Sequence, residues 1–90
     1  MASYGKDKED LLKRLRRIEG QVRGVQRMVA EEKYCVDILV QIAAIRSALD
    51  RVGLILLEDH TRGCVARALR SNDGDAAIAE LTEVIKRFLK

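Results

Sequence analysis

The chain has 90 residues, enough for one domain but for only a marginal core unless copies of the chain associate. Hydrophobic residues make up 48% of it and aromatic residues 3%, so its apolar content is aliphatic, which favours packed helices over strands or base-stacking platforms. The formal net charge of +3 permits an anionic partner without requiring one. We therefore expect an all-α fold with a single domain over residues 1–90.

The N-terminal residues lack the apolar core of a signal peptide, and no stretch approaches the roughly 20 apolar residues of a membrane span. The two cysteines are then expected to be reduced thiols, because structural disulfides are rare in the cytosol. These features predict a cytoplasmic protein without a membrane partner.

A first helix is predicted from about Lys6, after a frayed segment over residues 1–5. Acidic residues in its first turn suit the positive end of a helix dipole. Its apolar residues recur at alternating steps of four and three and form a stripe that needs a helical partner. They are Leu11, Leu15, Ile18, Val22, Val25 and Val29.

The face of this helix opposite the apolar stripe is basic. At about 100° per residue it carries Lys13, Arg16, Arg17, Arg23 and Arg27, with Arg14 on its flank. Only one acid, Glu19, lies between Lys13 and Arg27. This charge pattern suits nucleic-acid phosphate, and it also suits a solvated outer face.

A short polar break, Glu31-Glu32-Lys33, predicts that a second helix folds back antiparallel on the first. The second helix is expected to run unbroken from Cys35 to about Leu69, because no proline interrupts it. Its apolar seam indicates lengthwise packing against another helix. The seam consists of Ile38, Ile42, Ile45, Leu49, Val52 and Leu56.

The only cysteines and the only histidine, Cys35, His60 and Cys64, lie at the two ends of this second helix. Cys35 and His60 would be about 38 Å apart, whereas His60 and Cys64 share a helix face. Antiparallel pairing of two such helices would bring Cys35 of one chain level with His60 and Cys64 of the other, giving two identical three-ligand sites.

Two thiolates and one imidazole suit Cu(I) in a trigonal plane, whereas zinc would require a fourth ligand. Catalysis by a Cys–His pair is disfavoured, because no oxyanion donors or substrate cleft are evident, and we do not expect an enzyme. The remaining alternative is an obligate oligomer in which the cysteines are only small buried residues.

Residues Ser71–Asp75 are rich in turn formers and predict a break before a third helix. Its apolar side comprises Ala77, Leu81, Val84, Ile85 and Phe88, and Glu80 lies among its polar positions.

Three blocks of the sequence resemble the bacterial family of copper-sensing repressors, which includes nickel/cobalt, formaldehyde and persulfide sensors. The blocks are Arg14–Gly24, Tyr34–Asp37 and Gln41–Ala44, and the resemblance extends over nearly the whole chain. It implies three-helix protomers that form antiparallel dimers and then flat tetramers, a dimer of dimers. It also implies one Cu(I) per protomer, bound by Cys35 of one protomer and His60 and Cys64 of the other.

The resemblance separates the sensory subgroups at these positions. Nickel/cobalt sensors have a histidine where Cys64 stands and recruit an N-terminal histidine, which this chain lacks. Formaldehyde sensors generally lack the second thiol, and persulfide sensors lack the histidine. Cys35, His60 and Cys64 therefore match the copper pattern.

By the same resemblance, Tyr34 and Glu80 form an outer shell that hydrogen-bonds the non-coordinating nitrogen of the histidine and couples metal binding to DNA release. The DNA contacts implied are Arg14 and Arg17, helped by Lys13, Arg16 and Arg51.

The resemblance thus implies a Cu(I)-responsive repressor that binds operator DNA when metal-free. Its other expected partners are further copies of itself and a copper chaperone. One alternative is a sensor of formaldehyde, persulfide or zinc with the same fold, and another is a copper-buffering or interaction protein that does not bind DNA.

Overall fold

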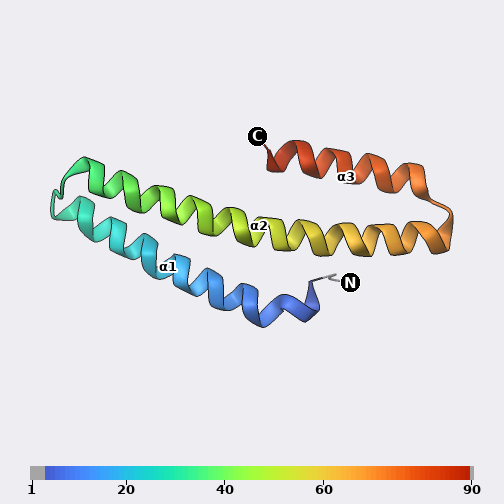
Figure 1. The fold of residues 1–90 in the computed structure, drawn as a ribbon, viewed down its shortest axis with the longest axis horizontal. Helices are drawn as coiled ribbons and strands as arrows, with labels where there is room; N and C mark the ends of the chain where they lie inside the picture. Colours follow the sequence, from blue (N-terminus) through green and yellow to red (C-terminus); the bar gives the residue numbers. More distant parts are fainter. Residues whose placement is uncertain (1–3, 90) are drawn as a thin grey trace. The chain divides into compact units, whose positions relative to one another are not determined.

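The computed structural model describes residues 4–89. A short 3-10 turn, η1 (Gly5–Asp7), precedes three α-helices: α1 (Lys8–Ala30), α2 (Cys35–Ser71) and α3 (Gly74–Phe88) (Figure 1). The described residues contain no strand, so the all-α, three-helix prediction is confirmed. The helix predicted from Lys6 starts at Lys8, because η1 occupies its expected first turn. The predicted frayed segment lies outside the described residues for positions 1–3.

The chain divides into two compact units, one formed by Lys6–Leu54 and the other containing Ile55–Lys90. Helix α2 contributes to both, since the boundary between the units lies within it. Each unit is a helical hairpin built on its own part of α2.

In the first unit, α1 runs antiparallel to the N-terminal part of α2 (Figure 1). Leu11 and Ile18 of the predicted stripe and Val52 of the predicted seam are buried, while Ile38 and Ile45 are half-buried. The periodicity therefore identified only part of each inward face. The other members of the stripe and seam that are exposed in the single chain are Leu15, Val22, Val29, Ile42, Leu49 and Leu56.

The connection between α1 and α2 is a Schellman motif. The Lys33 amide donates to the Met28 carbonyl at 3.0 Å, and the Glu32 amide donates to the Val29 carbonyl at 3.1 Å. Glu32 adopts the left-handed conformation, with φ of 54°. The polar break thus reverses the chain at a position where glycine is the usual residue.

In the second unit, α3 folds back along the C-terminal part of α2 (Figure 1). Helix α2 continues to Ser71, and the turn before α3 contains Asn72 with φ of 58°, a conformation that asparagine tolerates. Of the predicted apolar side of α3, Ala77 and Leu81 are half-buried, whereas Val84, Ile85 and Phe88 are exposed.

The predicted seam of α2 includes exposed apolar residues in both units. Ile42, Leu49 and Leu56 expose 38%, 47% and 37% of their surface in the single chain. Ile42 and Leu49 follow Cys35 at steps of seven residues, which keeps these three close to one face of the N-terminal part of α2. Clustered exposed aliphatic side chains at helical spacing are typical of a surface that packs against another helix.

None of the helices within residues 4–89 combines the length and apolar character needed to cross a membrane.

Candidate metal centre

His60 and Cys64 lie one turn apart on α2, in the unit that also contains α3. Cys64 is 3% exposed, and its thiol donates a hydrogen bond to the backbone carbonyl of Ala77 on α3 at 3.7 Å. Packing of α3 against this turn of α2 therefore shields the sulfur from solvent and fixes its direction.

Glu80 of α3 faces the imidazole of His60. Its Oε1 atom lies 3.2 Å from Nε2 of His60, an ion-pair distance when the imidazole is protonated. Nε2 is buried and the contact lacks the alignment of a hydrogen bond. The α2–α3 hairpin thus places a carboxylate beside one specific nitrogen of the ring.

The position of Glu80 determines which ring nitrogen can bind a metal. A histidine ligand binds through one nitrogen while the other contacts a carboxylate, carbonyl or water. Glu80 is next to Nε2, so Nδ1 is the nitrogen that a metal would require in this arrangement. An imidazole nitrogen and a thiol one turn apart on one face form a partial site for a soft cation.

Cys35 and Tyr34 lie at the other end of α2. Both are exposed, and Tyr34 retains 69% of its surface. Helix rise separates Cys35 from His60 by about 38 Å along α2, so the two cannot bind one ion within a chain. Correspondingly, residues 4–89 of the single chain bring together no group of three potential metal ligands.

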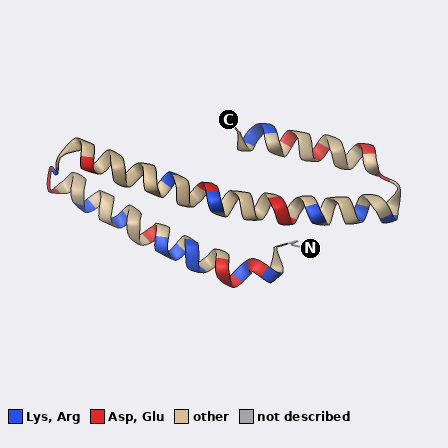
Figure 2. Cartoon of the chain, in the orientation of Figure 1, with Lys and Arg blue, Asp and Glu red and all other residues tan. Residues whose placement is uncertain are grey.

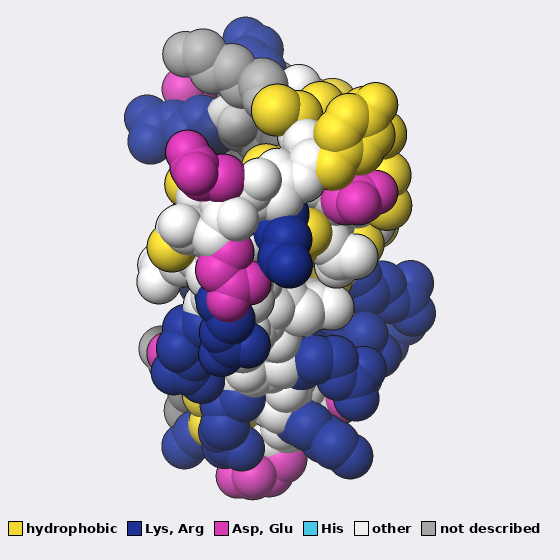
Figure 3. All heavy atoms as spheres, turned by 90° about the vertical axis from the view of Figure 1, so that its left-hand side faces the viewer, with side chains coloured by type: hydrophobic (Ala, Val, Ile, Leu, Met, Phe, Trp, Pro, Cys, Tyr) yellow, Lys and Arg dark blue, Asp and Glu magenta, His cyan; other side chains and the backbone are white. Residues whose placement is uncertain are grey.

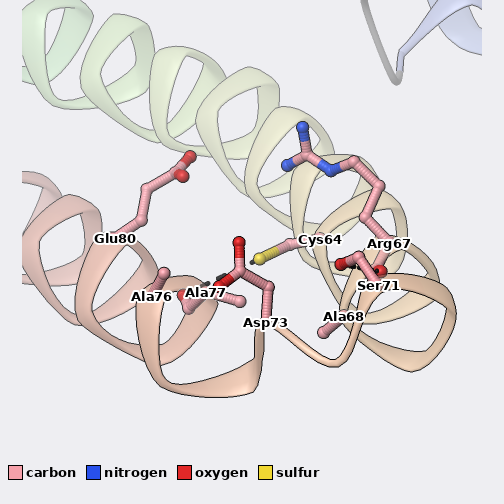
Figure 4. Close-up of a pocket in the computed structure, with 8 residues that line it drawn as sticks. All are labelled: Cys64, Arg67, Ala68, Ser71, Asp73, Ala76, Ala77 and Glu80. Atoms are coloured by element: carbon pink, nitrogen blue, oxygen red, sulfur yellow. Dashed lines mark hydrogen bonds between the residues drawn. The ribbon is translucent and has the colours of Figure 1, made fainter.

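A pocket of about 210 Å³ lies beside Cys64, between the C-terminal turns of α2 and the start of α3 (Figure 4). Its lining includes Cys64 and Glu80, and also Arg67 of α2 and Asp73 before α3. Arg67 was not predicted to lie near the metal ligands. The only sign of this in the sequence is its spacing of three residues from Cys64 on the same helix.

The predicted DNA contacts lie on the first unit. Lys13, Arg16 and Arg17 are exposed on α1, and Arg51 is exposed on α2. Arg14 is half-buried and its Nε donates to Asp10 at 2.9 Å. Figure 2 shows basic residues along α1. In Figure 3, Lys and Arg side chains gather over the lower part of the face shown.

The sequence is similar to that of proteins with known roles in transcription. Residues 7–87 match the sequence model of the family described as metal-sensitive transcriptional repressors. The copper-sensing transcriptional repressor CsoR of Bacillus subtilis (strain 168) is 56% identical over 85 residues, covering 94% of this chain and 84% of that protein.

Two solved structures are also similar. The Cu(I)-bound copper-sensing repressor CsoR of Geobacillus thermodenitrificans NG80-2 has a TM-score of 0.85 and 55% identity, covering 94% of this chain and 88% of that one. The nickel-responsive transcriptional regulator InrS has a TM-score of 0.82 and 45% identity, covering 89% of this chain and 90% of that one.

Proposed function

The chain belongs to the family of metal-sensitive transcriptional repressors, and on that premise we propose that it is a Cu(I)-responsive repressor. The metal-free protein binds operator DNA. Cu(I) lowers its affinity for the operator, and genes for copper resistance are then expressed. The proposal involves no catalysed reaction.

The observation that carries this proposal is the placement of the soft donors at the two ends of α2. His60 and Cys64 lie together in the unit that contains Glu80, and Cys35 is the first residue of the same helix, too far along it to join them within one chain. Two protomers with antiparallel α2 helices would complete two equivalent sites, each with Cys35 from one chain and His60 and Cys64 from the other. One Cu(I) per protomer follows.

The exposed apolar part of the α2 seam supports this pairing. Ile42 and Leu49 lie close to the helix face of Cys35, so the same contact would bury these aliphatic side chains and assemble the metal sites. Burial of aliphatic surface contributes roughly 25 cal/mol per Å². We propose that such dimers associate further into a dimer of dimers.

The donor chemistry fits copper. Two thiolates and one neutral imidazole suit a trigonal Cu(I) ion, which when bound would fix the positions of three side chains. His60 would bind through Nδ1, with Glu80 of the same chain held near Nε2. Tyr34, which is adjacent to Cys35, would join this outer shell from the other protomer. Through Glu80 on α3, the position of the ring is linked to the packing of the α2–α3 hairpin.

DNA binding is assigned to the basic surface of α1. Arg14 and Arg17 are the principal contacts, with Lys13, Arg16 and Arg51 as further ones. Their side chains are suited to phosphate because Lys and Arg neutralise backbone charge and release counterions. Membership in a family of transcriptional repressors supports a DNA partner. All of residues 1–90 would then act as one sensing and DNA-binding domain in the cytoplasm.

Mixed protomers test the shared site directly. Cys35→Ala and Cys64→Ala proteins should each bind little Cu(I) alone, because every site lacks one thiolate. Mixing and reassembling the two should restore one intact site in each mixed dimer, measured as Cu(I) retained against a competing chelator. No recovery on mixing would contradict a site shared between protomers.

A different inducer is the first alternative. The similarity to a nickel-responsive regulator favours testing another metal, and formaldehyde, persulfide and zinc remain candidate inducers within the same fold. A Cys64→Ser protein that kept its response to the inducer would favour a non-copper signal, because Cu(I) would lose one of its three donors.

Copper buffering without DNA binding is the alternative from another class. It predicts operator binding that is absent or insensitive to salt, whereas phosphate contacts give a strong salt dependence. The similarities described above give no support for a copper chaperone as a partner.

A further inference from the structure

Arg67 lies at the edge of the candidate metal centre and has no ion-pair partner among the described residues. It is the only basic residue among the eight that line the pocket beside Cys64 (Figure 4). Arg62 pairs with Glu58 at 2.6 Å, and Arg87 approaches Glu83 at 3.6 Å. Arg67, by contrast, makes no ion pair within residues 4–89.

Arg67 lines the same pocket as Cys64, three residues further along α2. A helical side chain leans toward the N-terminus of its helix, so Arg67 extends back over the turn that carries Cys64, three residues earlier. In Figure 4 the guanidinium extends along α2 away from Ser71, at the rim of the pocket into which the Cys64 sulfur points. The arrangement places a fixed positive charge near the metal centre without making Arg67 a ligand.

The charges that oppose Arg67 come from α3 and the turn before it. Asp73 and Glu80 line the same pocket, and Glu80 is already in contact with His60. Neither acid forms an ion pair with Arg67. The Arg67 guanidinium is therefore the positive charge in this pocket that can balance further negative charge on the metal centre.

The charge of the loaded site depends on the metal. Two thiolates and a neutral imidazole carry one net negative charge with a monovalent ion and none with a divalent ion. A fixed cation repels a divalent ion twice as strongly as a monovalent ion at the same position. A guanidinium near Cys64 thus raises the affinity for copper relative to that for zinc or nickel.

We propose that Arg67 is a specificity-determining residue, which favours monovalent copper over divalent metals through its charge. This inference rests on the proposed function, because it takes Cys35, His60 and Cys64 as the ligands. It assigns the discrimination between metals partly to a side chain that does not touch the ion.

The test compares metal affinities of the full-length protein in the absence of DNA. Cu(I) affinity is measured anaerobically against a chromogenic Cu(I) chelator, and Zn(II) affinity against a zinc chelator. Arg67→Gln should lower the ratio of Cu(I) to Zn(II) affinity by about tenfold at low ionic strength, and Arg67→Glu should lower it further. The change in this affinity ratio should be smaller in high salt, because Arg67 is exposed and salt screens exposed charges.

Two further variants separate charge from packing. Arg67→Lys keeps the positive charge and should retain most of the wild-type ratio. Arg70→Gln removes an exposed arginine one residue before the end of α2 that does not line the pocket, and it should leave the ratio unchanged. Helical content measured for each variant verifies that the fold is kept.

An unchanged ratio in both Arg67→Gln and Arg67→Glu, in a protein whose wild type binds Cu(I), would overturn the role of Arg67 and leave the proposed function intact. Equal losses in Arg67→Lys and Arg67→Gln would also overturn it, because charge would then be irrelevant. A wild-type protein that binds no Cu(I) would overturn the proposed function itself, and this inference with it.

Discussion

His60 and Glu80 meet across the α2–α3 hairpin, with Nε2 of the imidazole 3.2 Å from Oε1 of the carboxylate. The contact occupies Nε2 and links the ring to α3, and the proposed metal ligand is Nδ1. A ligand that fixes the orientation of the imidazole will therefore also restrict the position of the Glu80 carboxylate. This relationship provides a physical path from the metal centre to the packing of the helices.

Glu80→Ala should uncouple copper binding from DNA release. The three proposed ligands remain, so Cu(I) should still bind, while the copper-induced loss of DNA affinity should largely disappear. Such couplings are typically about 1 to 3 kcal/mol. The measurement is the operator affinity with and without saturating Cu(I), together with the Cu(I) affinity.

Glu83→Ala is the matched control for Glu80→Ala, because Glu83 lies on the same helix but its partner is Arg87. Its copper response should equal that of the wild type. A Glu80→Ala protein that binds copper and releases DNA normally would rule out the carboxylate as the link.

Leu49→Asp should weaken the association of protomers. Leu49 is 47% exposed on the face of α2 that carries Cys35, and a buried carboxylate there would be costly. Sedimentation at several concentrations should show smaller species than the wild type, with weaker Cu(I) binding.

Ser47→Asp adds the same charge to an exposed position on another face of α2 and should change neither property. Unaltered assembly of Leu49→Asp would argue against this face as the contact.

Arg17→Gln should lower operator affinity and its dependence on salt. Each phosphate that a basic side chain neutralises contributes a slope of about −0.9 to the plot of log affinity against log salt concentration. Because the substitution removes one such side chain from every protomer, the slope should become shallower by about 0.9 for each protomer whose Arg17 contacts a phosphate. Arg87→Gln removes an exposed arginine of α3 that already pairs with Glu83, and it should leave the slope unchanged. Equal slopes for the wild type and Arg17→Gln would exclude a phosphate contact.

Glu32→Gly should stabilise the protein. Glu32 holds φ of 54° at the Schellman turn, and a left-handed conformation costs a residue with a Cβ about 1 to 2 kcal/mol. Part of this gain is offset by the greater chain entropy of glycine, which leaves about 1 kcal/mol. Denaturant unfolding at a fixed protomer concentration measures the difference. Asn72→Gly should raise the free energy of unfolding by less, because asparagine tolerates a left-handed conformation. A Glu32→Gly protein less stable than the wild type would contradict this prediction.

The helices were largely predictable because their signals are local. Apolar spacing and the absence of proline predicted a long second helix starting at Cys35, and α2 starts there and ends at Ser71. The separation of Cys35 from His60 along such a helix also follows from its rise per residue. Helix geometry alone thus keeps Cys35 out of any site that His60 and Cys64 form within one chain.

Contacts between elements were not predictable from spacing. Nothing in the periodicity placed Glu80 beside His60 or the Ala77 carbonyl within reach of the Cys64 thiol, because both contacts depend on how α3 packs on α2. The role of Glu80 came from family resemblance, and Arg67 was missed because a single arginine on a long helix resembles any solvated residue. The strained backbone at Glu32 was hidden because the sequence has no glycine there.

In the proposed function, Cu(I) bound between protomers weakens DNA binding. The most direct measurement is an anaerobic Cu(I) titration of the fully reduced protein while its affinity for promoter DNA is followed. We predict a loss of affinity that saturates near one Cu(I) per protomer and is abolished by Cys35→Ala. Operator affinity that does not change with Cu(I) would contradict the claim and direct attention to other inducers of the same fold.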